Sequence, residues 1–233
     1  MSELPWLDKH TDFPNPSAAL SEPNGLLAAS SELCTEQILL AYRSGIFPWY
    51  SEEQPVLWWS PDPRCIIYPN QVHISRSLKK HNKQHQPRLT FDSHFAQVIR
   101  HCARLDSEEG TWITAEMEEA YIALHEAGYA HSVEVWENNT LIGGLYGIAM
   151  GQCFFGESMF SLAPNASKIA FAYLCRQLEK WNYQIIDCQV DNPHLRTLGA
   201  ITIPRKTFLE QLERSVNKPA RKHEWTFDIS DLK

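Results

Sequence analysis

The sequence predicts an α+β fold in which helices pack against a mixed or antiparallel sheet. Helical periodicity dominates the chain up to residue 128, and strand-like alternation runs from residue 131 to residue 159. One further helix and one further strand follow this meander. Because each element has one apolar face, packing the helices on the sheet buries those faces together.

The expected helices are marked by apolar residues on one side and by residues typical of helix ends. Ser75 and Thr114 are suited to cap N-termini, and Gly45 and Gly128 are suited to end helices. Before the first helix, residues 1–24 are rich in Pro, Ser and Asn, which is typical of extended surface chain. The expected helices are Glu36–Ser44, Ser75–His81, Phe91–Ala103, Thr114–Ala127, Asn165–Lys180 and Phe208–Val216.

The expected strands show alternation of apolar and polar residues. Asn138 and Asn139 provide a turn between two of the three strands that form the meander. The expected strands are Cys65–Tyr68, His131–Trp136, Thr140–Met150, Gln152–Met159 and Gln184–Val190.

A rigid aromatic segment separates two parts of the chain. Three tryptophans and four prolines lie between Pro48 and Pro63. Proline stiffens the backbone and aromatic side chains anchor it. We therefore expect a small N-terminal domain over residues 1–62 and a larger domain over residues 63–233, with Trp58 and Trp59 packing at the junction.

Composition excludes several classes of protein. The 233 residues are 43% hydrophobic and 21% charged, which fits a soluble globular protein. No apolar run approaches the roughly 20 residues that cross a bilayer, and the N-terminus lacks a signal-peptide pattern, so we expect a cytoplasmic protein with no membrane partner. The six cysteines form no CxxC pair and the ten histidines no HExxH motif, so we expect reduced thiols, no metal and no cofactor.

Charge is distributed unevenly along the chain. A net charge of −7 argues against nucleic-acid binding over the whole surface. However, no acidic residue lies between Asp62 and Asp92. A solvated helix is the ordinary interpretation of a charge run, but this absence of acids favours a local polyanion site. One face of the predicted basic helix carries Arg76, Lys79, Lys80 and Lys83.

Two polar residues stand close together in the last predicted strand. Side chains alternate between the faces of a strand, so Asp187 and Gln189 should share one face and Cys188 should lie on the other. A carboxylate beside a carboxamide is suited to orient and deprotonate an amine.

Glu157 is the only acid in an uncharged, glycine-punctuated aromatic run from Gly143 to Ser161. A carboxylate in such surroundings is costly unless a cation balances it. The cation is either a structural partner, such as Lys168 or an arginine, or a cationic ligand. We favour the ligand.

The order of the last elements is similar to that of acyltransferases that hold an acyl donor between splayed strands. Acyl-CoA enzymes of this architecture bind pyrophosphate with a Gly-rich loop, whereas Phe160–Lys168 contains no glycine. An acyl-CoA N-acyltransferase stays an alternative. A non-catalytic RNA-binding module is another, although it leaves the three polar residues above unexplained. A thiol enzyme built on Cys153 or Cys188 has no histidine nearby in sequence.

Several sequence blocks in fixed order resemble the leucyl/phenylalanyl-tRNA–protein transferase family over nearly the whole chain. Such a set is much more specific than a single short motif. The blocks are Glu22–Leu27, Gly45–Trp49, Leu57–Arg64, His73–Ser77, Glu109–Thr114, Gly156–Ser161, Asn165–Lys168 and Asp187–Val190.

This resemblance implies a cytoplasmic enzyme with an acyltransferase-like (GNAT-type) C-terminal domain, a small N-terminal domain and no cofactor. It implies transfer of leucine or phenylalanine, and less well methionine, from aminoacyl-tRNA to a protein that begins with Arg or Lys. The modified protein is thereby marked for degradation in the N-degron pathway. The implied partners are leucyl-tRNA, phenylalanyl-tRNA and proteins with N-terminal Arg or Lys.

The resemblance also implies roles for individual residues. Asp187 polarises Gln189, which orients and deprotonates the attacking amine, and Glu157 binds the basic side chain of the acceptor. Trp49 and Trp112 stack on the terminal adenosine of the donor. The basic helix contacts phosphates of the tRNA acceptor stem. The implied aminoacyl pocket consists of Leu145, Phe154, Met159, Ser161, Phe171, Leu174, Leu178 and Ile186.

Overall fold

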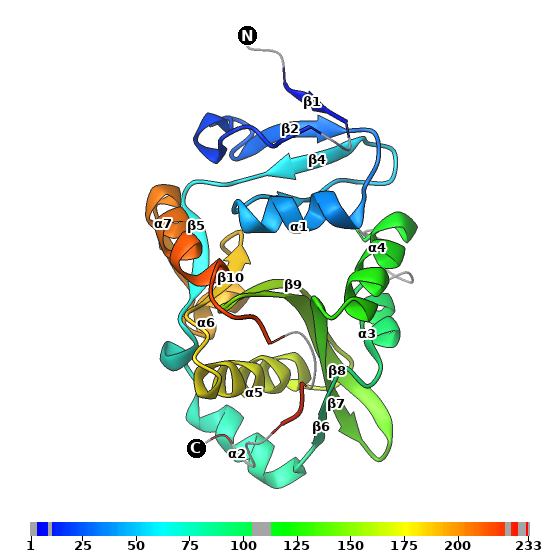
Figure 1. Ribbon diagram of the computed structural model, residues 1–233. Helices are drawn as coiled ribbons and strands as arrows, with labels where there is room; N and C mark the ends of the chain where they lie inside the picture. Colours follow the sequence, from blue (N-terminus) through cyan, green and yellow to red (C-terminus); the bar gives the residue numbers. More distant parts are fainter. Residues whose placement is uncertain (1–3, 9–10, 104–112, 222–224, 228–231, 233) are drawn as a thin grey trace.

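The computed structural model describes residues 4–8, 11–103, 113–221, 225–227 and 232. These residues form two sheets with helices packed against them, so the predicted α+β class is confirmed (Figure 1).

The first sheet has four short strands in the order β1-β2-β4-β3. It adjoins helix α1 (Thr35–Arg43) at the top of Figure 1. Trp58 is fully buried in this part, and its indole Nε1 donates to Ser30 Oγ at 3.0 Å. The sequence pattern predicts none of its four strands, because they are short and do not alternate. The strands are β1 (Trp6–Leu7), β2 (Leu26–Ser30), β3 (Phe47–Pro48) and β4 (Val56–Trp59).

The second sheet has the strand order β11-β5-β10-β9-β8-β7-β6. Its neighbouring strands are antiparallel except for β9 and β10, which run parallel. The sheet is therefore mixed. Its strands are β5 (Arg64–Ile67), β6 (Arg88–Phe91), β7 (Ala130–Glu137), β8 (Thr140–Met150), β9 (Cys153–Ser161), β10 (Ile185–Gln189) and β11 (Ile201–Ile203).

The predicted meander is confirmed as β7-β8-β9. Asn138 and Asn139 connect the first two of these strands with φ of 50° and 63°, values that asparagine tolerates well in a hairpin turn. The helix predicted from Phe91 was wrong at its start. Phe91 ends strand β6, because pairing with β7 extends the chain there, and α3 begins only at Phe95.

The predicted helices are present, with shifted bounds, and α6 was not predicted. Gly45 and Gly128 follow α1 and α4 with φ of 74° and 75°, a conformation that glycine adopts without strain. The remaining helices are α2 (Arg76–His85), α3 (Phe95–Ala103), α4 (Ala115–Glu126), α5 (Ala166–Lys180), α6 (Pro193–Thr197) and α7 (Arg205–Val216), and the short 3-10 helices are η1 (Pro16–Ala18) and η2 (Pro69–Gln71).

Alternation along β8 divides the core between the two faces of the large sheet. Tyr146 and Ile148 belong to a cluster with residues of α1, α3 and α4. Leu145 and Ala149 point the other way and pack with α5. In Figure 1, α5 accordingly lies on the side of β9 opposite to α1. The candidate site uses residues from both sides of this sheet.

Candidate active site

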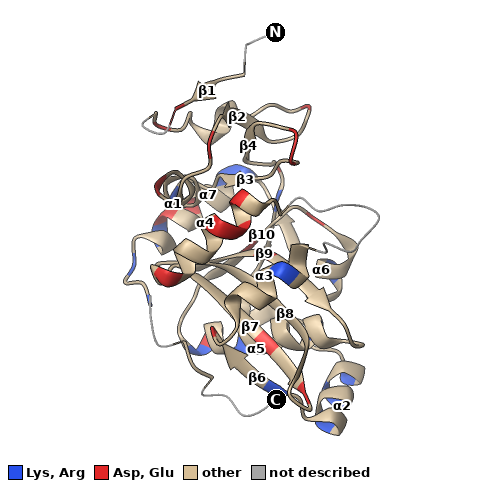
Figure 2. Ribbon diagram, turned by 90° about the vertical axis from the view of Figure 1, so that its right-hand side faces the viewer, with Lys and Arg blue, Asp and Glu red and all other residues tan. Residues whose placement is uncertain are grey.

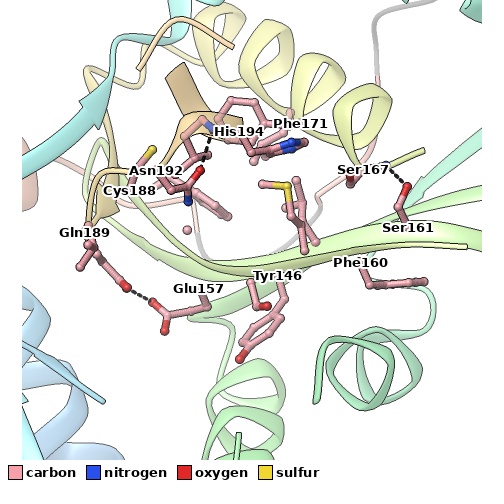
Figure 3. Close-up of a pocket in the computed structure, with 18 of the residues that line it drawn as sticks. Tyr146, Glu157, Phe160, Ser161, Ser167, Phe171, Cys188, Gln189, Asn192 and His194 are labelled. Carbon is pink, nitrogen blue, oxygen red and sulfur yellow. Dashed lines mark hydrogen bonds between the residues drawn. The ribbon is translucent and has the colours of Figure 1, made fainter. Parts of the chain in front are cut away.

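A cleft of about 1000 Å³ opens where β9 and β10 separate (Figure 3). The two parallel strands are paired only over Cys153–Phe155 and Ile185–Asp187. Beyond these residues they diverge, and the residues that follow line the cleft together with the start of α5, helix α6 and the Phe47–Trp49 segment. The separation of two sheet strands is therefore what creates the site.

Two irregularities in the strands turn polar side chains toward the cleft. In β9, Tyr146 pairs with Ser158 and Gly147 with Gly156, which leaves Glu157 as an extra residue. In β10, the register with β5 shifts between Asp187 and Gln189. Extra residues of this kind re-aim side chains and recur next to active sites.

Asp187 is fully buried and forms an ion pair with Arg64, which is also fully buried. The guanidinium donates from Nε to Oδ1 at 2.8 Å and from Nη2 to Oδ2 at 2.7 Å. It lies between the rings of Phe47 and Phe208, at 4.8 and 4.6 Å from their centroids. Such a bidentate pair fixes the geometry of the strand that carries it.

The expectation that Asp187 and Gln189 share one face was wrong. Gln189 has φ of 61°, so the strand alternation fails at this residue, and both Cys188 and Gln189 line the cleft while Asp187 does not. Asp187 contacts the backbone of Gln189 instead: the Gln189 N–H donates to Oδ1 at 2.9 Å. The carboxylate thereby holds the turn that presents the carboxamide.

Glu157 accepts hydrogen bonds from three side chains. Tyr42 and Tyr121 donate to its two oxygens at 2.6 and 2.9 Å. Gln189 donates to it from Nε2 at 2.9 Å, a contact shown in Figure 3. The two phenols also lie 2.7 Å apart. No described basic side chain forms an ion pair with Glu157, so neither Lys168 nor any described arginine is its structural partner.

Burial raises the pKa of Glu157 to about 7, although the hydrogen bonds from Tyr42 and Tyr121 oppose this shift. The residue borders the cleft and is half-buried, while Tyr42, Tyr121 and Gln189 hold its carboxylate. Near neutral pH the group is therefore divided between its neutral and ionised forms. A cation entering the cleft would favour the ionised form.

Most of the predicted aminoacyl pocket lines the cleft. Phe154 and Leu145 lie on the sheet side, and Phe171 and Leu174 on the α5 side. Leu178 and Ile186 belong to the packed core behind them and do not line the cleft. Met159 and Ser161 also line it.

Ser161 has a further role at the edge of the cleft. Its Oγ accepts the backbone N–H of Ser167 at 3.2 Å, and the hydroxyl donates to the carbonyl of Ala163 at 2.9 Å (Figure 3). These contacts fix the start of α5 against the end of β9. They position one wall of the cleft relative to the other.

Trp49 lies at the mouth of the cleft with 45% of its surface exposed. Its carbonyl accepts from the indole Nε1 of Trp59 at 2.7 Å, and the two rings are 5.8 Å apart. The segment is thus held rigidly while the Trp49 ring stays accessible. Trp112, the second tryptophan proposed to stack on adenosine, lies outside the described residues.

Helix α2 carries several basic residues, at the lower right of Figure 2. Ser75 caps the helix as predicted, accepting the N–H of Leu78 at 3.1 Å. Leu78 is the buried residue of this helix and anchors it to the domain. The four predicted tRNA-contact residues Arg76, Lys79, Lys80 and Lys83 are all exposed.

Sequence reasoning missed several residues of the site. Tyr42 and Tyr121 lie in two of the expected helices and were not assigned to the site, yet their hydroxyl groups hold Glu157. The signal was available, because a buried tyrosine hydroxyl needs a polar partner. The cleft is also lined by His101, Asn192 and His194.

The thiol alternative has little support in the geometry. Cys188 does line the cleft, but a hydrogen bond with Cys65 and burial raise the pKa of its thiol. Burial likewise raises the pKa of Cys153. A thiol nucleophile needs a lowered pKa or an adjacent base.

Two features are absent from the described residues. None of their helices combines the length and apolar character needed to cross a bilayer. None of their His, Cys, Asp and Glu side chains forms a group of three or more suited to hold a metal ion.

Comparison with known proteins identifies the family. Two family models match, leucyl/phenylalanyl-tRNA protein transferase over residues 66–213 and its N-terminal domain over residues 31–62. The leucyl/phenylalanyl-tRNA–protein transferase of Hahella chejuensis (strain KCTC 2396) is 53% identical over 98% of each chain. That of Pseudomonas fluorescens (strain SBW25) is 54% identical over 93% of this chain and 96% of its own.

Among solved structures, that of L-PGS from Bacillus licheniformis aligns with a TM-score of 0.41 and 11% identity, over 72% of this chain and 54% of that one. The sequence comparisons are far stronger than this likeness. They establish that the chain is an aminoacyltransferase and belongs to the leucyl/phenylalanyl-tRNA–protein transferase family.

Proposed function

We propose that the protein transfers leucine or phenylalanine, and less well methionine, from aminoacyl-tRNA to the N-terminal Arg or Lys of acceptor proteins in the cytoplasm. The observation that carries this proposal is one cleft that combines an apolar wall, an accessible tryptophan and a buried carboxylate beside a carboxamide. The apolar wall matches the amino-acid side chain of the donor, and the tryptophan matches its adenine base. The carboxylate matches the basic side chain of the acceptor, and the carboxamide matches its α-amine.

We also propose that the catalytic domain, residues 63–233, is of the acyltransferase (GNAT) type and is preceded by a small domain over residues 1–62. The splayed parallel strands β9 and β10 support the first part. Support for the second comes from the two sheets, because the first ends with β4 at Trp59 and the second begins with β5 at Arg64. The ranges of the two family models agree with this division.

The donor enters with its amino-acid side chain against the apolar wall. Phe154 lines the cleft from the sheet and Phe171 lines it from α5, and Met159 supplies a flexible surface that accepts both leucine and phenylalanine. The adenine of the donor stacks on Trp49, a contact worth about 1–3 kcal/mol. The ester carbonyl then lies between this wall and Gln189.

The acceptor enters with its basic side chain toward Glu157. A guanidinium or ammonium group there forms a charge-assisted hydrogen bond with the ionised carboxylate. Because Nε2 of Gln189 already donates to Glu157, its Oε1 is left to accept from the α-amine of the acceptor. This contact orients the lone pair of the nitrogen toward the carbonyl carbon.

The reaction forms a C–N bond and breaks the ester C–O bond to the ribose. Gln189 orients the amine, and the proton that the amine loses ends on the departing ribose oxygen. Holding the two groups in attack geometry is the main contribution of the enzyme, an effect that reaches about 7–11 kcal/mol. Asp187 acts as a positioning residue, because it reaches the reaction only through the backbone of Gln189 and through Arg64.

The test is a transfer assay with purified protein. Radiolabelled leucyl-tRNA and phenylalanyl-tRNA are mixed with peptides that begin with Arg, Lys or Ala. We expect label to move to the Arg and Lys peptides and not to the Ala peptide. Equal labelling of the three peptides, or transfer from acyl-CoA instead of tRNA, would contradict the proposal.

A further inference from the structure

A second pocket, of about 460 Å³, lies between α2, α5 and α6. Two of its residues are permanently charged cations from different helices, Lys168 of α5 and Arg196 of α6. None of the described residues that line it is acidic. The pocket is lined by His73, Ser75, Leu78, Lys168, Arg196, Thr197 and Leu198.

Helix α6 separates this pocket from the cleft. His194 and Leu195 line the cleft, and the next residues, Arg196 and Thr197, line the second pocket. The two spaces are therefore one helix apart. Lys168 lies close enough to His194 for its charge to help lower the pKa of that imidazole, after the larger effect of burial.

An ion pair between Arg196 and Asp191 joins the two spaces. Arg196 donates from Nε to Asp191 Oδ1 at 2.8 Å and uses Nη2 for the second oxygen, while Asp191 lines the cleft. Within the described part of the chain, Arg196 Nη1 makes no hydrogen bond. One net positive charge results from Lys168, Arg196 and Asp191 together. A single phosphodiester would balance it.

The pocket also adjoins the basic helix. Leu78 lines it, and Arg76 and Lys79 of the same helix are exposed on either side of that residue. In Figure 2, α6 and α2 lie on the same side of the molecule. A polyanion lying on α2 would pass this pocket before its end reached the cleft.

We infer that the second pocket binds a backbone phosphate of the unpaired 3′ nucleotides of the donor tRNA, through Lys168 and Arg196. This inference rests on the proposed function and extends it to the donor's path. A paired stem on α2 and an adenosine in the cleft must be connected by single-stranded nucleotides. By binding a phosphate of these nucleotides, the pocket holds the 3′ end of the donor and so sets the position of the ester in the cleft.

The test uses three donors of increasing length: leucyl-adenosine without phosphates, a leucylated CCA trinucleotide, and leucyl-tRNA. The pocket variant combines Lys168→Gln with Arg196→Gln. The control combines Lys206→Gln with Lys218→Gln, two exposed lysines elsewhere that give the same change in net charge. A third variant, Lys79→Glu with Lys83→Glu, alters α2 alone.

In the pocket variant we expect the KM for the trinucleotide and for leucyl-tRNA to rise about tenfold, as for loss of a hydrogen bond to a charged group. The KM for leucyl-adenosine should stay at the wild-type value, which also shows that the variant is folded. The α2 variant should raise the KM for leucyl-tRNA only. The control should leave the KM for all three donors unchanged.

An unchanged KM for the trinucleotide in the pocket variant would overturn the inference while leaving the proposed function intact. An equal rise in KM for all three donors would also overturn the inference, because the two substitutions would then act on the cleft itself. A wild-type protein that transfers from none of the donors would instead contradict the proposed function.

Discussion

Replacing Glu157 by Gln removes the charge proposed to bind the acceptor while preserving the shape of the site. The hydrogen-bond network can be kept. Oε1 of the new residue can still accept from Tyr42 and Gln189, its amide can donate to the Tyr121 oxygen, and the Tyr121 hydroxyl can donate to Tyr42. We therefore expect the variant to fold with nearly unchanged stability.

The magnitude of the effect follows from the charge and from the raised pKa. Losing one partner of a buried charge pair typically costs about 2–5 kcal/mol. Since the pKa of Glu157 is about 7, ionising it at pH 7 already requires roughly 0.4 kcal/mol. The expected loss for Arg and Lys peptides at pH 7 is about 2–4 kcal/mol, or roughly 30- to 1000-fold in kcat/KM.

The same shift predicts how acceptor use depends on pH. The carboxylate forms as pH rises through about 7, so at pH 6 its ionisation costs about 1.4 kcal/mol. Binding of the Arg peptide at pH 6 is then about tenfold weaker than to the fully ionised carboxylate, and about fivefold weaker than at pH 7. The α-amine of the peptide also titrates near pH 8, but this contribution to the pH dependence is the same for wild type and Glu157→Gln. The ratio of their kcat/KM values should therefore grow from pH 6 to pH 8.

The assay measures kcat/KM for Arg, Lys and Ala peptides at pH 6, 7 and 8 in both proteins. A thermal melt of each protein checks folding. A Glu157→Gln variant that keeps the preference for Arg and Lys, or a ratio that does not change with pH, would refute the reasoning.

Three further predictions follow from the site. Asp187→Asn should lower the free energy of unfolding by about 3–5 kcal/mol, because it leaves the buried Arg64 guanidinium without its carboxylate; denaturant unfolding checks this. The same variant should abolish transfer in a transfer assay, while tRNA binding stays measurable in a filter-binding assay. Trp49→Ala should raise the KM for leucyl-adenosine roughly 5- to 150-fold, the equivalent of about 1–3 kcal/mol of lost stacking. Trp49→Phe should keep the KM near the wild-type value, and equal KM values in the two variants would argue against stacking. Reversing Lys79 and Lys83 should weaken tRNA binding regardless of tRNA sequence and reduce its salt dependence, measured as the slope of log affinity against log salt.

Much of the fold could be predicted because local signals agreed with the tertiary structure. The meander from Ala130 to Ser161 has long strands and an asparagine turn at residues 138 and 139, and α5 is a long helix. The short strands β6 and β11 depend on pairing with β7 and β5, which no local pattern reveals. Propensity is a weak guide where tertiary pairing decides the conformation.

The candidate site was predictable in its residue types but less so in its geometry. Glu157 and Gln189 do line one cleft, yet alternation along β10 put Asp187 there as well. The positive φ of Gln189 is set by the Asp187 carboxylate, which is itself held by Arg64. A contact between residues more than 100 positions apart cannot be read from strand alternation, although a lone charge in each of two apolar strands suggests such a pair.

The most direct test of the shared cleft is a crystal structure with an amide-linked leucyl-adenosine analogue and a peptide that begins with Arg. We predict the leucyl side chain between Phe154 and Phe171, the adenine on Trp49, and the guanidinium of the peptide on Glu157, with its α-amine beside Oε1 of Gln189. An analogue bound away from this cleft, or a peptide whose basic side chain lies far from Glu157, would contradict the account.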